Sequence, residues 1–161
     1  MSEHPFRLLT LENADNVMPV LDAELNGHTV RLVIDTGASH TCLDRSVVKK
    51  YAPEACRKRV SPDDDAGKTK ENTVMGLGGR RLSHVVGVVD MLKIGELEIR
   101  DYMVVAVRLA NINKMLRWIG QEPIDGLLGC DILRTYRVSL DFERQRLVFS
   151  SFQNNSPFFP Y

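Results

Sequence analysis

The chain of 161 residues is long enough for one domain with its own core, and its 21 Lys and Arg residues balance 21 Asp and Glu residues. This balance argues against a nucleic-acid partner, and no apolar run is long enough to predict a membrane span or a signal peptide. Three widely spaced cysteines, Cys42, Cys56 and Cys130, argue against a disulfide framework and predict a reducing, cytoplasmic setting. The histidines and cysteines lack zinc-ligand spacing, so we expect no metal and no cofactor.

Short strands separated by turns are predicted over the first part of the chain. Asn26–Gly27 is a strong two-residue hairpin pattern, so the strand after it returns antiparallel and ends directly before Asp35. Asp44 is the predicted N-cap of the first helix. The predicted elements of this part are strands over Phe6–Leu11, Val17–Leu25 and Thr29–Ile34 and a helix over Arg45–Tyr51.

The second part of the chain begins with a polar segment, residues 61–72, which predicts a surface loop. A glycine-rich turn at Gly76–Gly79 follows, flanked by two predicted strands. From Leu109 to Ile119 the apolar residues take a helical period, which predicts that Leu109, Ile112, Leu116 and Ile119 share a buried face. The other predicted elements are a hairpin of Val85–Lys93 and Glu98–Val107 with its turn at Gly95, a short helix near Asp131–Thr135, and strands over Arg137–Phe142 and Arg146–Phe149.

This order of elements predicts an all-β fold with two or three short helices. Many short strands at regular spacing are typical of a barrel or a sandwich. We expect one domain over residues 1–161, with the polar loop at 61–72 and a C-terminal tail at about 150–161.

The segment Val33–Ser39 reads VIDTGAS and carries the strongest chemical indication. An aspartic protease needs two adjacent carboxylates that share one proton, so that one activates water while the other protonates the substrate carbonyl oxygen. A carboxylate at the end of a core strand is held rigidly, and a glycine two residues later lets its backbone N–H approach that carboxylate. Asp35, Thr36 and Gly37 therefore form the candidate catalytic loop.

Three landmarks together resemble the retropepsin-like aspartic proteases, the family of the retroviral proteases and their bacterial relatives. VIDTGAS is similar to the catalytic loop, MGLGGRRL at Met75–Leu82 to the glycine-rich flap that closes over a peptide, and IDGLLGCDIL at Ile124–Leu133 to the segment that threads beside the catalytic loop. The resemblance spans about Val17 to Phe149 and implies an acid-protease barrel with one lobe per chain. It also implies a peptide or protein substrate, with substrate-binding residues Ala38, Gly76, Leu77, Gly78, Gly79, Leu127, Leu128 and Gly129.

Asp-Thr-Gly occurs once, so one chain cannot supply both carboxylates of such a site. The resemblance therefore implies a homodimer in which two Asp35 side chains meet on the two-fold axis and Thr36 bonds to the partner's loop. Two departures from the retroviral pattern are Ser39 and Cys130, which replace an acidic residue and an arginine. Ala38 stands where many acid proteases have a hydroxyl, which predicts a mildly acidic optimum, roughly pH 5–6.

Each landmark also has a structural interpretation. Asp35 is then the cap of a turn, Gly76–Gly79 a plain hairpin tip, and the DGLLG segment a buried strand and turn with no partner loop. Asp131 is then the N-cap of the short helix. A dinucleotide fingerprint fits poorly, because Arg81 stands where its third glycine belongs. At the level of function, the alternatives are a retropepsin-fold module that binds peptides or partners with little turnover, and a monomeric domain that becomes active only on dimerisation.

Overall fold

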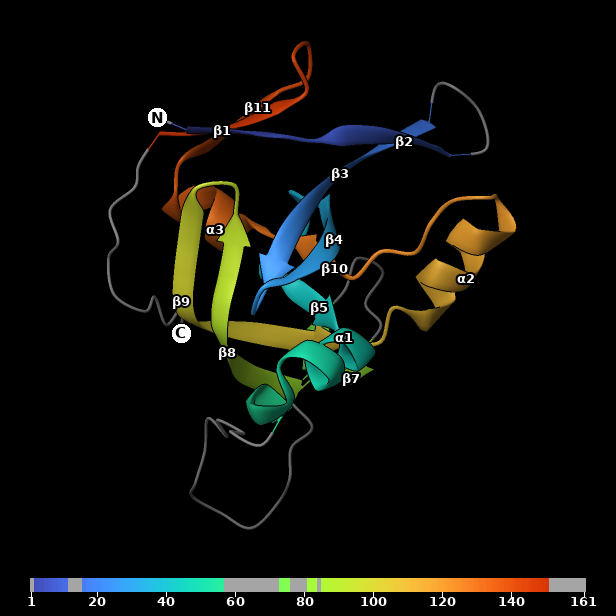
Figure 1. Cartoon of the computed structure of the whole chain (residues 1–161). Helices are drawn as coiled ribbons and strands as arrows, with labels where there is room; N and C mark the ends of the chain where they lie inside the picture. Colours follow the sequence, from blue (N-terminus) through green and yellow to red (C-terminus); the bar gives the residue numbers. More distant parts are fainter. Residues whose placement is uncertain (1, 12–15, 57–72, 76–80, 84, 151–161) are drawn as a thin grey trace.

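A computed structural model describes residues 2–11, 16–56, 73–75, 81–83 and 85–150. Strands dominate it, as predicted, and the helices are short (Figure 1). The elements are β1 Ser2–Pro5, β2 Arg7–Leu11, β3 Asn16–Leu25, β4 His28–Ile34, β5 Cys42–Asp44, α1 Arg45–Tyr51, a 3-10 turn Pro53–Cys56, β6 Thr73–Met75, β7 Arg81–Ser83, β8 Val85–Ile94, β9 Leu97–Val107, α2 Ala110–Trp118, β10 Gly126–Leu128, α3 Cys130–Thr135, β11 Val138–Asp141 and β12 Arg146–Phe149.

A seven-stranded sheet in the order β2-β3-β4-β10-β5-β9-β8 forms the body of the fold. The last strand, β8, also pairs with the end of β3 through Glu24 and Lys93, so the sheet closes into a barrel. The short strand β10 lies between β4, to which it is parallel, and β5, to which it is antiparallel. The all-β prediction is confirmed, and the predicted threading segment lies directly beside the strand that ends at Asp35.

A second sheet joins the two ends of the described chain. Its order is β1-β12-β11, and β1 pairs antiparallel with β12 from Ser2 opposite Phe149 to Pro5 opposite Arg146. In Figure 1 this sheet lies at the top, while α1 and the β6–β7 pair lie at the bottom and α2 at the right. The terminal strands are thus paired within one chain.

The sheet has two apolar faces, because successive side chains of a strand point to opposite sides. Leu32 and Ile34 of β4 and Leu128 of β10 belong to the larger group of buried residues, which we call the main core. Val33 of β4 lies on the other side, in a smaller group that α2 covers. This second cluster consists of Val20, Val33, Cys42, Val105, Val107, Leu109, Leu116 and Ile124, with Leu127 packed against it.

The turns and helices follow the sequence closely. Asn26 and Gly27 have φ of 49° and 81°, the left-handed backbone that a tight hairpin needs, and Asp44 caps α1 by accepting a hydrogen bond from the Ser46 N–H at 2.8 Å. One predicted face was wrong. Ile112 is exposed, and Asn113 is buried in its place because its amide pairs with the backbone of Ile124.

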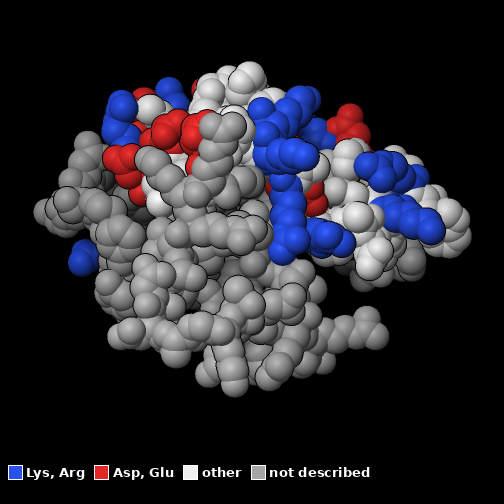
Figure 2. Space-filling model, turned by 90° about the horizontal axis from the view of Figure 1, so that it is seen from below, with Lys and Arg blue, Asp and Glu red and all other residues white. Residues whose placement is uncertain are grey.

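Lys and Arg side chains gather on the underside of the molecule, over α1 and α2 (Figure 2). Lys49 and Lys50 lie in the last turn of α1, and Arg117 lies in the last turn of α2. Positive side chains interact favourably with the carbonyl end of a helix, so these positions stabilise both helices slightly. The zero net charge of the chain therefore does not mean that its surface charge is evenly spread.

Candidate active site

Asp35 directly follows β4 and is held by the neighbouring strand. Its N–H donates to the Leu128 carbonyl at 3.0 Å, which continues the parallel pairing of β4 with β10 for one more residue. Ile34 before it is buried, whereas Asp35 itself is half-buried and the next two residues are exposed. The core strand thus delivers a carboxylate to the surface on a fixed backbone.

The loop after Asp35 folds back on its carboxylate. The Gly37 N–H donates to Asp35 Oδ1 at 2.9 Å, and the Ala38 N–H donates to the Asp35 carbonyl at 3.1 Å. Cys130, at the start of α3, clamps the same loop from the other side. Its N–H donates to the Ala38 carbonyl at 2.8 Å and its thiol to the Thr36 carbonyl at 3.1 Å. The loop and the segment after β10 are therefore one hydrogen-bonded unit.

A buried polar network supports this unit from below. The Thr41 hydroxyl accepts a hydrogen bond from the Gly129 N–H at 2.9 Å and donates to Asp131 Oδ1 at 2.8 Å, and the Thr41 N–H donates to the same oxygen at 2.9 Å. The Tyr102 hydroxyl donates to the other oxygen of Asp131. Burial, followed by the negative charge of Asp131, raises the pKa of Tyr102, so this hydroxyl stays a donor. The carboxylate of Asp131 is occupied by structure rather than available for chemistry.

Gly129 is required where the two segments cross. A Cβ at this position would lie 2.5 Å from the carbonyl carbon of His40 and 2.8 Å from the Thr41 nitrogen, and neither backbone atom can move without the loop. Gly129 is also the N-cap of α3, so the prediction that Asp131 fills that position was wrong. Asp131 lies in the first turn instead, where its side chain reaches Thr41.

Cys42 lies under the candidate catalytic loop in the second cluster. Burial, followed by the charges of Asp131 and Asp35, raises the pKa of its thiol from 9.0 to about 11. The thiol donates to the His40 carbonyl at 3.4 Å. Cys42 is therefore a neutral packing residue of the second cluster.

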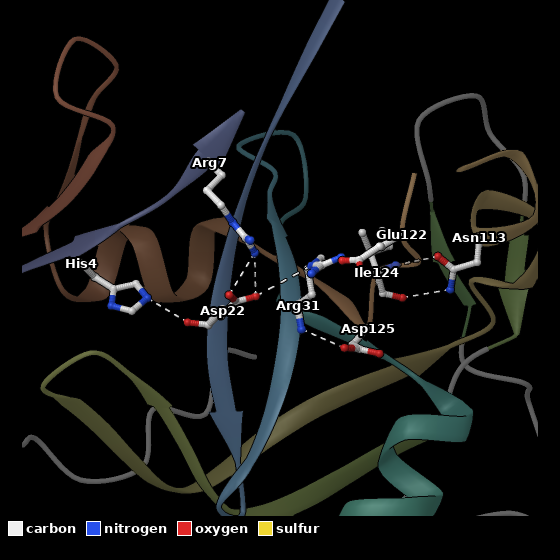
Figure 3. A network of polar contacts seen from close by, with 8 residues as sticks. All are labelled: His4, Arg7, Asp22, Arg31, Asn113, Glu122, Ile124 and Asp125. Carbon is white, nitrogen blue, oxygen red and sulfur yellow. Dashed lines mark hydrogen bonds and ion pairs between the residues drawn. The ribbon is translucent and has the colours of Figure 1, made fainter. Parts of the chain in front are cut away.

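Acidic side chains also fix the approach to β10. The Asp125 carboxylate accepts from the Arg31 N–H at 2.8 Å, while its own N–H donates to the Arg31 carbonyl at 2.8 Å (Figure 3). Asp44 accepts from the N–H of Leu109 at 2.8 Å, just before α2. Burial alone would raise the pKa of Asp44, but hydrogen bonds from Ser46, Leu109 and Val47 outweigh it and hold this pKa below 3.8. Both carboxylates are structural, and Asp44 has the helix-cap role that the sequence predicts.

The site consists of one half-exposed carboxylate at the end of a strand. The segment after β10 is hydrogen-bonded to its loop, and a buried network of Thr41, Asp131 and Tyr102 supports that segment. The family model described as aspartyl protease matches residues 21–132, which include all of these parts.

The chain belongs to the aspartyl protease family. Its fold is that of the retropepsin-like members, as the solved structures show. It aligns with the retroviral protease-like domain of Ddi1 from Leishmania major at a TM-score of 0.51 and 14% identity, covering 89% of this chain and 94% of that one. It aligns with a retropepsin-like aspartic protease from Rickettsia conorii at a TM-score of 0.50 and 16% identity, covering 91% of this chain and 86% of that one. It aligns with EIAV protease complexed with the inhibitor HBY-793 at a TM-score of 0.50 and 17% identity, covering 83% of this chain and 100% of that one.

The chain is also similar in sequence to curated proteins named Protein DDI1 homolog 2. Protein DDI1 homolog 2 of Mus musculus is 25% identical over 144 residues, and its Homo sapiens counterpart is 25% identical over 145 residues. Each alignment covers 89% of this chain. The chain spans only about 30% of the length of these relatives.

The structure brings some of the predicted site residues of this chain together and separates others. Thr36, Gly37 and Ala38 follow Asp35 in one loop, and Leu127 lies beside Val33 on the α2 side of the sheet. Leu128 is fully buried in the main core and Gly129 is buried at the crossing, so both support the loop from within. Residues 76–80, with the predicted flap tip Gly76, Leu77, Gly78 and Gly79, lie outside the described residues, although their flanks pair as β6 and β7.

Two features are absent from the described part of the chain. Within it, no three His, Cys, Asp or Glu side chains are grouped as a metal ion would require. None of its helices combines the length and the apolar character needed to cross a membrane.

The residues that hold the candidate catalytic loop were not predicted from the sequence. Thr41 and Tyr102 gave no pattern, because their partner Asp131 is 90 and 29 residues away along the chain. A buried threonine six residues after Asp35 and an acid two residues after Gly129 were the only hints in the sequence.

Proposed function

We propose that this protein is an aspartic endopeptidase that works as a homodimer, with one Asp35 from each chain. The supporting observation is the position of Asp35, a half-exposed carboxylate at the end of a strand. The Gly37 N–H donates to this carboxylate, and the Asp35 N–H donates to the Leu128 carbonyl. Asp131, the other acid of this region, is held by Thr41 and Tyr102 and cannot serve as the second carboxylate. A symmetry-related Asp35 would complete the pair.

In this mechanism the two carboxylates hold one proton between them. The ionised one takes a proton from a water molecule, whose oxygen attacks the peptide carbonyl carbon, while the protonated one donates its proton to the carbonyl oxygen. The tetrahedral diol then loses its amine, to which a proton returns, and an acid and an amine are released. The Gly37 N–H at 2.9 Å from Asp35 Oδ1 holds the carboxylate in one orientation throughout.

The proposed dimer forms around the exposed Thr36 and Gly37. Because β1 and β12 are already paired within one chain, we do not expect the terminal strands to be exchanged between subunits. We further infer that Ala38 and Leu127 contact the peptide and that Gly76–Gly79, between β6 and β7, is the tip of a flap. We place the protein in the cytoplasm, where Cys42 and Cys130 would stay reduced.

A subunit-poisoning experiment tests the shared site most directly. Wild-type protein is incubated with a diverse peptide pool across pH, with and without pepstatin, while sedimentation gives its size. We expect Asp35→Asn to lower cleavage by at least roughly 10²–10⁴-fold, because Asn cannot exchange the shared proton. Excess Asp35→Asn chains added to the wild type should inhibit it further than dilution does, because mixed dimers carry one carboxylate.

Asp101→Asn is the matched control. Asp101 is exposed and has a φ of 49°, a conformation that Asn tolerates well, so this variant should change neither activity nor inhibition on mixing. Cleavage that persists in Asp35→Asn would contradict the proposal. Peptide binding by the wild type without any cleavage would instead favour the binding-module alternative.

A further inference from the structure

The outer side of α2 carries a strip of exposed apolar side chains. Ile112, Met115 and Trp118 are 40%, 51% and 82% exposed, and their spacing of three residues places them along one side of the helix. An amphipathic helix on a protein surface normally has polar residues there. A contiguous exposed apolar strip of this kind marks an interaction site more often than isolated exposed residues do. We call these three residues the α2 strip.

The helix that carries this strip is firmly anchored. Leu109 and Leu116 are buried in the second cluster. The Asn113 amide donates to the Ile124 carbonyl at 2.9 Å and accepts from the Ile124 N–H at 2.8 Å (Figure 3), and Gln121 donates to the Thr10 carbonyl at 2.8 Å. The strip therefore has a fixed position relative to the barrel, as a docking surface needs if it is to orient what it binds.

The α2 strip lies on the same side of the sheet as the candidate catalytic carboxylate. Leu116 of α2 packs in the cluster that contains Val33, and Asp35 follows Val33 by two residues, which returns a strand to the same face. A polypeptide that lay against Leu127 near Asp35 would have α2 at its side.

The charge around the strip restricts what can bind it. Arg108, Lys114 and Arg117 are exposed, and none has an ion-pair partner in the part of the chain that the structure describes. No acidic residue occurs between Arg108 and Gln121, and basic side chains cover this edge of the molecule (Figure 2). Two α2 helices facing each other would bring these like charges together, which argues against a second copy as the occupant.

We propose that the α2 strip is an accessory docking site for the polypeptide substrate and selects segments in which Asp or Glu side chains alternate with large apolar ones. The apolar side chains would pack on Met115 and Trp118, and the acidic ones would pair with Lys114 and Arg117. This inference rests on the proposed function, because it makes α2 an extension of the surface beside Asp35.

Trp118 is the only tryptophan of the chain and reports binding directly through its fluorescence. The Asp35→Asn protein is titrated with a synthetic 16-residue peptide in which Glu alternates with Leu and Phe. We expect a saturable blue shift of the emission, because docking removes Trp118 from water, and no shift with the peptide in which Lys replaces Glu. Lys114→Glu with Arg117→Glu should weaken binding by about tenfold, and Met115→Gln should weaken it with all charges kept.

Arg144→Glu with Arg146→Glu is the control variant, because it makes the same change in charge on exposed residues, one in the β11–β12 turn and one at the start of β12. It should bind the acidic peptide as the parent protein does. Equal weakening in both double variants would overturn the proposal, since binding would then follow net charge. A blue shift produced by phosphatidylserine vesicles but not by the peptide, or by raising the protein concentration alone, would overturn it in favour of a membrane or a second copy.

Kinetics separates this inference from the proposed function. In the active protein, Lys114→Glu with Arg117→Glu should lower kcat/KM for a long acidic substrate and leave that for a minimal six-residue peptide unchanged. Equal kcat/KM values for the long substrate in the wild type and in this double variant would overturn the docking proposal and leave the proposed function standing. If the wild type cleaves no peptide, the proposed function fails, whereas a saturable shift of Trp118 emission would still establish the docking site.

Discussion

The two faces of the seven-stranded sheet differ in what they are built to do. The main core is closed, with large side chains from β3, β4, β8, β9, β10 and β12 buried together. The second cluster is smaller and is bounded by the half-buried Leu127, the neutral thiol of Cys42 and the amide of Asn113. Asp35 belongs to this second side. Stability thus resides mainly on one face of the sheet, and the candidate chemistry on the other.

Adjacent residues on β10 offer the sharpest way to break this comparison. Leu128 is fully buried in the main core, so Leu128→Ala should lower the free energy of unfolding by about 2–5 kcal/mol. Leu127, on the other face, is half-buried, so Leu127→Ala should cost roughly 1–2 kcal/mol. Chemical denaturation measures both values. In the Leu127→Ala protein, peptide cleavage should fall by more than the loss of folded protein explains. Equal losses of unfolding free energy in Leu127→Ala and Leu128→Ala would show that the two faces of the sheet are equivalent.

The support beneath the loop gives the next largest effect. Thr41→Val keeps the shape of the side chain but leaves the Gly129 N–H unpaired and removes a donor to Asp131, which should cost roughly 1–3 kcal/mol. Thr41→Ser keeps the hydroxyl and loses one methyl group, which should cost only about 0.8 kcal/mol. Urea unfolding of the two variants compares them directly. Equal losses in both would mean that packing, and not the hydrogen bonds, holds the catalytic loop.

The fold was more predictable from the sequence than the site. The Asn26–Gly27 turn and the cap at Asp44 depend on neighbours in the chain and are found as expected. The predicted strands lie within one residue of the observed ones at each end, whereas the strands β1 and β5 were not predicted. The buried position of Asn113 and the role of Asp131 depend on the backbone at Ile124 and on Thr41, which the fold alone brings near. Local patterns could therefore locate Asp35 but not the network that holds its loop.

The thiol of Cys42 gives an effect that depends on pH. Its pKa is about 11 in the folded chain against 9.0 ordinarily, so the fold favours the neutral thiol. This contribution is fully present below pH 9 and is lost as the pH rises toward 11. Between pH 8 and pH 10.5 the wild type should lose about 2 kcal/mol more of its unfolding free energy than Cys42→Ala does. Parallel pH profiles of the two proteins would show that the second cluster does not bury the thiol as described.

The smallest expected effect concerns Ala38, which follows the candidate catalytic residues Asp35, Thr36 and Gly37. Its N–H donates to the Asp35 carbonyl, and its methyl side chain offers no hydrogen bond to a carboxylate. A hydroxyl at this position could donate to the ionised carboxylate and would favour the charged form of the pair. The working state of the proposed dimer holds one proton, and the two carboxylates titrate as one coupled unit. Without that donor, the one-proton state should persist to higher pH, and we expect an optimum at roughly pH 5–6.

Ala38→Ser should move the acidic limb of the pH profile of kcat/KM downward by a fraction of a pH unit, while Ser39→Ala, at the exposed neighbouring position, should leave it in place. An optimum near pH 2–3 in the wild type would contradict this reasoning, because it requires a carboxylate pair already held in its charged form. An upward shift in Ala38→Ser would contradict it too, because the added hydroxyl would then favour the protonated form.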